Sequence, residues 1–205
     1  MTSSAIISHL SKLQPSHATA YFFFDGRHSQ KELQLHDKLI RSLIWQFSLK
    51  CGGIVPKVLA DLYFHCGKGH QQPSLSDLHN VLQMMLDGIG SAYIILDALD
   101  ECSERDKTLD WVQTVILHKN ENLRLHLITT SRPEKEINDK LNSYHCVDMV
   151  KESENHDIEV YLDNQLRTGW KKWPPEIQNK IKSTLREQAD GMYVSKLVME
   201  SQNDC

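Results

Sequence analysis

The sequence predicts an α/β domain: a mainly parallel sheet with helices on both faces, in three layers, followed by an all-α segment. Short apolar runs recur in the first 150 residues, and they are continuous rather than alternating. Amphipathic helical patterns separate these runs, and from Asp157 onward only helical patterns occur. Continuous apolar strands between helices are typical of a parallel sheet that is buried on both faces.

Length and composition agree with one soluble α/β core. The chain has 205 residues, of which 40% are hydrophobic and 24% charged. A net charge of -4 gives no electrostatic reason to expect nucleic acid or an acidic membrane as a partner. The N-terminus has no secretory signal pattern, and no apolar run approaches the ~20 residues of a membrane helix. Five scattered cysteines without a C-x-x-C pair indicate reduced thiols, so we expect a cytoplasmic protein.

The first half of the chain predicts one strand among four helices. A first helix begins near Ser3 or Ser4, either of which can cap it. The aromatic run at residues 20–24 is too short for a helix, and we interpret it as a buried strand that ends at Asp25-Gly26. Further helices follow at residues 39–47, from Pro56, and after Ser74, which forms a capping box with Asp77.

The second half predicts three more strands. Glycines at positions 88 and 90 precede a strand at residues 92–96, a helix around Trp111 leads to a strand at 125–129, and a short helix leads to a fourth strand at 145–149. We place the boundary between the α/β core (1–152) and the helical segment (153–205), with a disordered C-terminal tail, at this change of pattern.

The segment most indicative of chemistry is the acidic stretch after the second strand. Asp97 follows four apolar residues, and Asp100 and Glu101 come three and four positions later. In open parallel sheets, ligands bind at the carboxyl ends of the strands. A carboxylate there can hold Mg²⁺, usually through water, and a second acid can orient or deprotonate an attacking water. The alternative is a strand that simply ends in a solvated acidic loop.

An arginine follows the next strand. Arg132, within Ser-Arg-Pro, lies at the same predicted sheet edge, where its planar guanidinium suits a terminal phosphate. Taken alone, Arg132 is more readily interpreted as a surface arginine in a turn that ends at Pro133. The two segments together favour a functional site.

These features together resemble fungal NACHT domains, which are STAND-class P-loop NTPases often described as nephrocystin-like N-terminal domains. The resemblance spans roughly residues 3 to 193 and rests on the segments at 20–25, 41–44, 96–102, 130–134 and 189–192. It implies a P-loop NTPase-like fold, with Asp97 as the Walker B aspartate that holds Mg²⁺. It also implies that Asp100 and Glu101 are the following acidic pair and that Arg132 is the sensor arginine.

One motif of that family is missing. A phosphate-binding loop has the form G-x-x-x-x-G-K-[ST], and no such string occurs in the sequence. Gly67-Lys68 is followed by Gly69 where a hydroxyl is required, and Thr2 lacks a preceding Gly-Lys. By resemblance the loop would fall just upstream of Met1. We therefore expect a degenerate or truncated switch core that hydrolyses little or no ATP or GTP alone.

The resemblance implies a function in nucleotide-controlled switching, related to signalling in non-self recognition. The cofactors of the intact family are Mg²⁺ with ATP or GTP, and we expect this chain to bind none of them firmly. An alternative is a non-enzymatic interaction module that docks onto full-length NACHT relatives or onto itself.

The absence of the phosphate-binding loop and its preceding strand also affects the sheet that we predict. In the family, the strand before the phosphate loop lies between the strand that ends near Arg132 and the strand near Val147. We expect a gap there, with the last strand either detached or paired directly with the strand at 125–129. Either arrangement predicts a marginally stable chain that associates readily.

Overall fold

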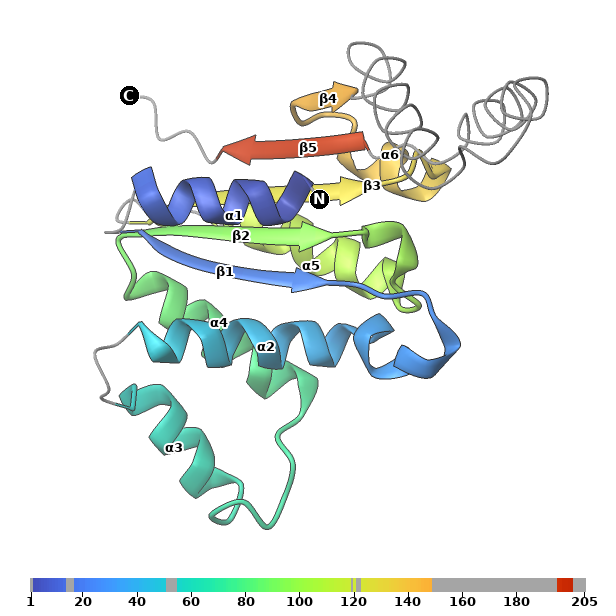
Figure 1. Cartoon of the computed structure of the whole chain (residues 1–205). Coiled ribbons are helices and arrows are strands. Elements are labelled where there is room, and N and C mark those ends of the chain that lie inside the picture. The colour runs from blue at the N-terminus through green and yellow to red at the C-terminus, as the bar shows by residue number, and fades with distance from the viewer. Residues whose placement is uncertain are drawn as a thin grey trace, which may run out of the picture.

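The computed structural model is a sheet flanked by helices on both faces (Figure 1). It describes residues 2–13, 17–50, 55–118, 120, 123–148 and 195–200. The strands are β1 (Ala18–Phe23), β2 (Ser91–Asp97), β3 (Arg124–Ser131), β4 (Cys146–Asp148) and β5 (Ser195–Glu200). The α-helices are α1 (Thr2–Leu13), α2 (His36–Leu49), α3 (Lys57–His65), α4 (Leu75–Asp87), α5 (Arg105–Leu117) and α6 (Lys135–Leu141). Two 3-10 helices, η1 (His28–Gln34) and η2 (Leu99–Glu101), follow β1 and β2.

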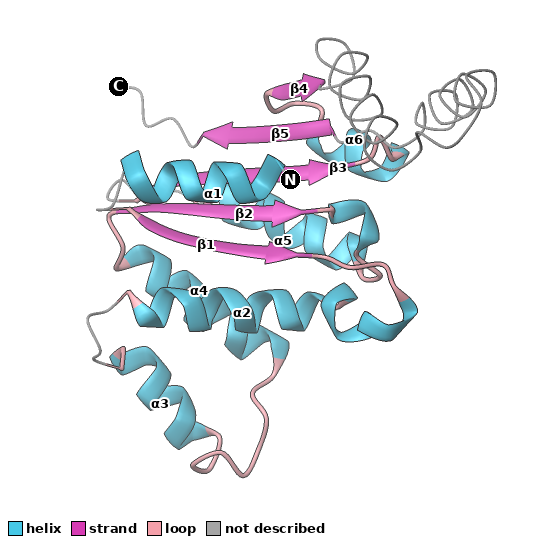
Figure 2. Ribbon diagram, in the orientation of Figure 1, coloured by secondary structure: helices cyan, strands magenta, loops and turns pink. Residues whose placement is uncertain are grey.

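The strand order is β1-β2-β3-β5-β4, and the first three strands run parallel. Their carboxyl ends therefore meet at one edge, where the loops after β1 and β2 lie together (Figure 2). The α/β class and the four strands predicted from apolar runs are confirmed, with ends that differ by no more than two residues. Most of the predicted helical segment and tail (153–205) lies outside the described residues. Where the structure does describe it, at Ser195–Glu200, the chain forms strand β5 instead of a helix or a disordered tail, so the prediction is wrong there.

The sheet differs from the prediction at its centre. We expected a gap between β3 and the last predicted strand, closed by detachment or by direct pairing of the two. Instead β5 lies between them, antiparallel to β3 over residues 126–131 and antiparallel to β4. The reason is that β3 is buried almost throughout, so its second row of backbone groups needs a partner. Residues 195–200 provide that partner.

The main core lies between the sheet and the layer formed by α2, α4 and α5. It is made of interdigitating aliphatic and aromatic side chains, among them Phe22, Leu43, Leu86, Ile94, Val112 and Leu127. Ile95 is fully buried but lies outside this cluster, because alternate residues of a strand face opposite sides of the sheet. Helix α1, which contacts β1 and β2, lies over this second face (Figure 1).

A local signal marks the start of α4. The capping box predicted at Ser74 and Asp77 is present in both directions at the start of α4. Helix α1, in contrast, begins at Thr2, so Ser3 lies inside its first turn and does not cap it. None of the helices in the described part of the chain has the length and apolar content that a bilayer crossing requires.

A buried polar network joins α2, α4 and α5. His36, which has no exposed surface, contacts the Thr108 hydroxyl at 3.0 Å through Nδ1 and the Nε2 atom of His79 at 2.9 Å through Nε2. Burial and, to a lesser extent, the nearby His79 together lower the pKa of His36 from 6.5 to about 4; burial also lowers the pKa of His79. The folded domain therefore holds His36 neutral.

We expect this network to make the domain less stable in mild acid. His36 takes up a proton near pH 6.5 in the unfolded chain but only near pH 4 in the folded chain. The free energy of unfolding therefore has its full value above pH 6.5 and decreases as the pH falls from 6.5 to 4. The slope is at most about 1.4 kcal/mol per pH unit for each titrating group. Urea unfolding from pH 7.5 to 5 measures it. His36→Gln should flatten the slope, whereas substitution of the exposed His70 by Gln should leave it unchanged.

Candidate functional site

The parallel register brings the predicted site residues together. Asp97 ends β2 beside Phe23 of β1, and Leu96 is paired with Thr129 of β3. The chain then turns sharply at Ala98, which has a left-handed backbone (φ 55°) unusual for a residue other than glycine. Its amide donates to the Thr130 hydroxyl at 3.1 Å, which holds this turn against β3.

Asp97 ties three elements to one another. Its Oδ1 atom accepts hydrogen bonds from the hydroxyls of Ser3 in α1 and Thr130 in β3, each at 2.5 Å. Both donors are buried, with 2% and 1% of their surfaces exposed. The carboxylate is therefore fixed in position at the point where α1 begins over the ends of β2 and β3.

Asp100 and Arg132 form a two-point contact. The backbone amide of Arg132 donates to Asp100 Oδ1 at 3.0 Å, and its Nε lies 3.1 Å from Oδ2. The Asp100 side chain is 8% exposed and that of Arg132 is 50% exposed. On the other side, Arg105 donates to the Asp100 carbonyl at 2.6 Å. The aspartate is thus buried with its charge paired, as a buried carboxylate requires.

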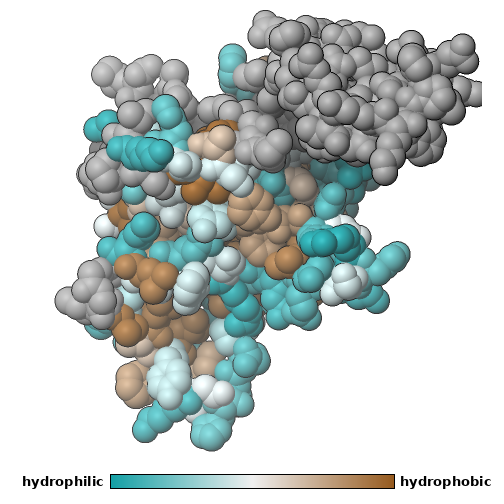
Figure 3. Space-filling model, in the orientation of Figure 1, coloured by the Kyte–Doolittle hydropathy of each residue, from teal (hydrophilic) through white to brown (hydrophobic). Residues whose placement is uncertain are grey.

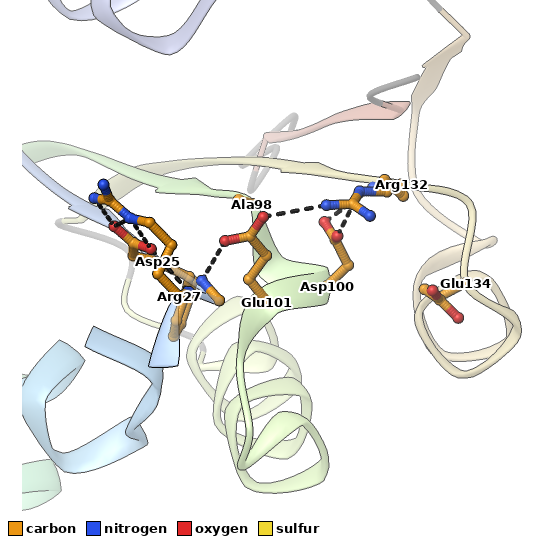
Figure 4. A pocket seen from close by; sticks show the side chains of 9 residues that line it. Asp25, Arg27, Ala98, Asp100, Glu101, Arg132 and Glu134 are labelled. Atoms are coloured by element: carbon orange, nitrogen blue, oxygen red, sulfur yellow. Dashed lines mark hydrogen bonds and ion pairs between the residues drawn. The ribbon is translucent and has the colours of Figure 1, made fainter. Parts of the chain in front are cut away.

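Glu101 contacts groups from two other loops. Its Oε1 atom lies 3.2 Å from a terminal nitrogen of Arg132, and its Oε2 atom accepts a hydrogen bond from the Gly26 amide at 2.5 Å. Figure 4 shows Glu101 between Arg132 and the turn that contains Asp25 and Arg27.

The Asp25-Arg27 turn is the part of the site that the sequence analysis missed. The Asp25 carboxylate pairs with the Arg27 guanidinium and accepts from the Arg27 amide at 3.0 Å. These hydrogen bonds lower the pKa of Asp25 to about 2. The signal was available, because Asp25 directly follows a strand that shares the sheet edge with Asp97, but a single acidic residue in a turn is common.

These groups surround an open cleft of about 650 Å³. Its lining residues are Phe24, Asp25, Gly26, Arg27, Ala98, Asp100, Glu101, Arg132 and Glu134. Four carboxylates face two guanidinium groups, so the walls carry a net negative charge. Of the four predicted site residues, Asp100, Glu101 and Arg132 line the cleft, whereas Asp97 is not among the lining residues and contacts Ser3 and Thr130.

The side chains available as ligands can be compared with those that the Mg²⁺ implied by the resemblance would need. Within the residues that the structure describes, no group of three or more His, Cys, Asp or Glu side chains is arranged to hold a metal ion. Mg²⁺, however, commonly uses one or two carboxylates and completes its shell with water and phosphate oxygens. Asp97 and the Ser3 hydroxyl fit that partial role.

The fold and this cleft place the chain among open α/β domains with a polar site at the carboxyl ends of parallel strands. A family model described as "Nephrocystin 3, N-terminal" matches residues 1–132, and the chain belongs to that family. The match covers β1, β2, β3 and every residue that lines the cleft except Glu134. Comparisons with curated proteins and with solved structures found no match.

We expect Thr130 to stabilise the domain through its two hydrogen bonds. Thr130→Val keeps the shape of the side chain but removes the acceptor of the Ala98 amide and one of the two hydroxyl donors to Asp97 Oδ1, which should cost about 1–3 kcal/mol. Urea unfolding measures the difference. The matched control is Thr114→Val at an exposed position of α5, where the hydroxyl donates to the Asp110 carbonyl of the same helix. An equal loss in both variants would contradict the role given to Thr130.

Proposed function

We propose that the chain is the core of a NACHT-type nucleotide switch that binds Mg²⁺-ATP or Mg²⁺-GTP weakly and hydrolyses little of either alone. The observation that carries this proposal is the convergence of Ser3, Asp97, Asp100, Glu101 and Arg132 on one end of a parallel sheet. Membership of the nephrocystin 3 N-terminal family supports it. In such a switch, bound nucleotide stabilises one conformation over another.

The charges of the cleft argue for a metal-dependent ligand. A free phosphate would meet a net negative wall, and Mg²⁺ would supply the compensating positive charge on the phosphate oxygens. Asp97 and Ser3 are the residues we assign to the metal, and Arg132 to the terminal phosphate. Asp100 would hold Arg132 in place, and Glu101 would orient a water molecule.

Low activity is part of the proposal. Positioning and charge neutralisation of the phosphates carry most of phosphoryl-transfer catalysis. The sequence contains no G-x-x-x-x-G-K-[ST] string to supply the backbone amides and the lysine for this work.

We place the protein in the cytoplasm, with itself or full-length NACHT relatives as partners, and assign no nucleic acid or membrane partner.

A second candidate is the interaction module, and an exposed apolar surface favours it. Trp45 and Leu49 at the end of α2 and Tyr63 and Phe64 in α3 are each 53–62% exposed. In Figure 3, apolar atoms gather in the lower left, over these helices. Binding to a full-length relative that is lost in a Trp45→Ser/Phe64→Ser variant, without any nucleotide binding, would favour this candidate.

We expect the purified chain to bind Mg²⁺-nucleotide weakly and to show no hydrolysis above background. Fluorescent ATP and GTP analogues, titrated with Mg²⁺ and then with EDTA, measure binding, and phosphate release measures turnover. Asp97→Asn should reduce Mg²⁺-dependent binding about tenfold or more, because it removes a charged metal ligand. Turnover that disappears in Glu101→Gln would contradict the expected lack of hydrolysis.

We also expect activity to be recoverable. A strand and a G-x-x-x-x-G-K-[ST] loop from a close relative, joined before Met1, should give tight Mg²⁺-nucleotide binding and measurable hydrolysis. In that fusion, Arg132→Ala should reduce turnover more than affinity, since a sensor acts mainly on the reacting phosphate. If Asp97→Asn leaves binding by the fusion unchanged, the assignment of the acidic segment is wrong.

A further inference from the structure

The two contacts of Glu101 differ in how firmly each partner is held. The Gly26 amide belongs to a backbone turn with several supports: Phe24 donates to the Asp97 carbonyl at 3.0 Å and Asp25 to the Leu33 carbonyl at 3.3 Å. The Asp25-Arg27 pair closes the same turn from outside. The position of the Gly26 N–H group is therefore fixed by its neighbours.

The other contact is a long, half-exposed side chain. The Arg132 guanidinium reaches Glu101 at 3.2 Å and Asp100 at 3.1 Å, its side chain is 50% exposed, and the residue lines the cleft. The backbone of Arg132 stays attached to Asp100 Oδ1 through its own amide at 3.0 Å. The guanidinium can therefore leave both carboxylates by side-chain rotation while the chain at this point keeps its place.

We propose that Glu101 is held by a fixed anchor, the Gly26 amide, and by a releasable lock, the Arg132 guanidinium, which a bound phosphate draws away. This regulation rests on the nucleotide-binding function proposed above. A terminal phosphate is a stronger competitor for guanidinium than a single carboxylate, because it offers three oxygens instead of two and carries more negative charge. Once released, Glu101 keeps its Oε2 contact, and its Oε1 atom faces the cleft.

Gly26 suits the anchor because it leaves room for the carboxylate. A Cβ atom at this position would lie 3.2 Å from Glu101 Oε2 and 3.3 Å from its carboxyl carbon, so alanine would push the acid aside. Gly90, at the opposite end of β2, has nothing within 4 Å of such an atom and provides a matched control. Gly26 is thus a positioning residue that acts through Glu101.

The anchor is tested without ligand, by amide hydrogen exchange in the full chain. Glu101→Ala should make the Gly26 amide exchange about tenfold faster, as expected for loss of a charge-assisted hydrogen bond. Arg132→Ala should leave the exchange rate of Gly26 within about twofold of wild type. Equal acceleration in both variants would overturn the proposal, since it would make the two contacts one inseparable network. Because Glu101→Ala can also disturb the turn, Gly26→Ala against Gly90→Ala gives a second measurement: only the former should shift the Glu101 carboxyl carbon resonance.

The lock is tested with Mg²⁺-ATP as probe and the Arg132 side-chain Nε–H resonance as readout. Binding should shift this resonance and leave the Gly26 amide protected. Resonance shifts elsewhere in the cleft with an unmoved Arg132 signal would overturn the lock and leave nucleotide binding intact. No shift anywhere at millimolar Mg²⁺-ATP would overturn the proposed function and the lock with it, while the ligand-free exchange data still decide the anchor.

Discussion

The parallel pairing of β1, β2 and β3 is the constraint on which the cleft depends. Because the three strands run the same way and in this register, the segments after them must leave the sheet at one edge. The turn at Asp25, the acidic stretch at Asp100 and Glu101, and Arg132 come from positions up to 107 residues apart, and this pairing brings them close enough for Glu101 to contact both Gly26 and Arg132. Asp97 then fixes α1 to the same edge through Ser3.

The other side of the sheet obeys a different constraint. Strand β3 is central and buried, so the backbone groups on its second edge need a partner whatever the direction of that partner. Strand β5 meets this need in the antiparallel sense, which is why the otherwise parallel sheet is mixed at this point. The cleft is unaffected, because its lining comes from the parallel strands and the residues just after them.

Periodicity and strand-end chemistry were enough to predict much of this structure. Apolar runs located β1, β2 and β3, and the capping box located the start of α4, because each is a local property of the chain. Asp100, Glu101 and Arg132 could be placed at one edge because parallel topology follows from the pattern of strands and helices. β5 could not be predicted, since its pairing depends on a vacancy next to β3, more than sixty residues away in sequence. The contact between Gly26 and Glu101 could not be predicted either, because every residue except proline has a backbone amide and the sequence does not show which amide meets a carboxylate.

The paired state of the cleft also bears on how tightly it can bind anything. Asp100 and Glu101 have protein donors already, so the domain can fold without the penalty of unpaired buried carboxylates. A ligand therefore exchanges one set of charge-assisted contacts for another, and only the difference between the two sets contributes to its affinity. Under the function we propose, a phosphate would gain the Arg132 guanidinium but deprive two carboxylates of it, and the proposed metal ion would offset that loss. Such a balance would favour weak binding that changes the surroundings of Glu101, as the proposed switch requires.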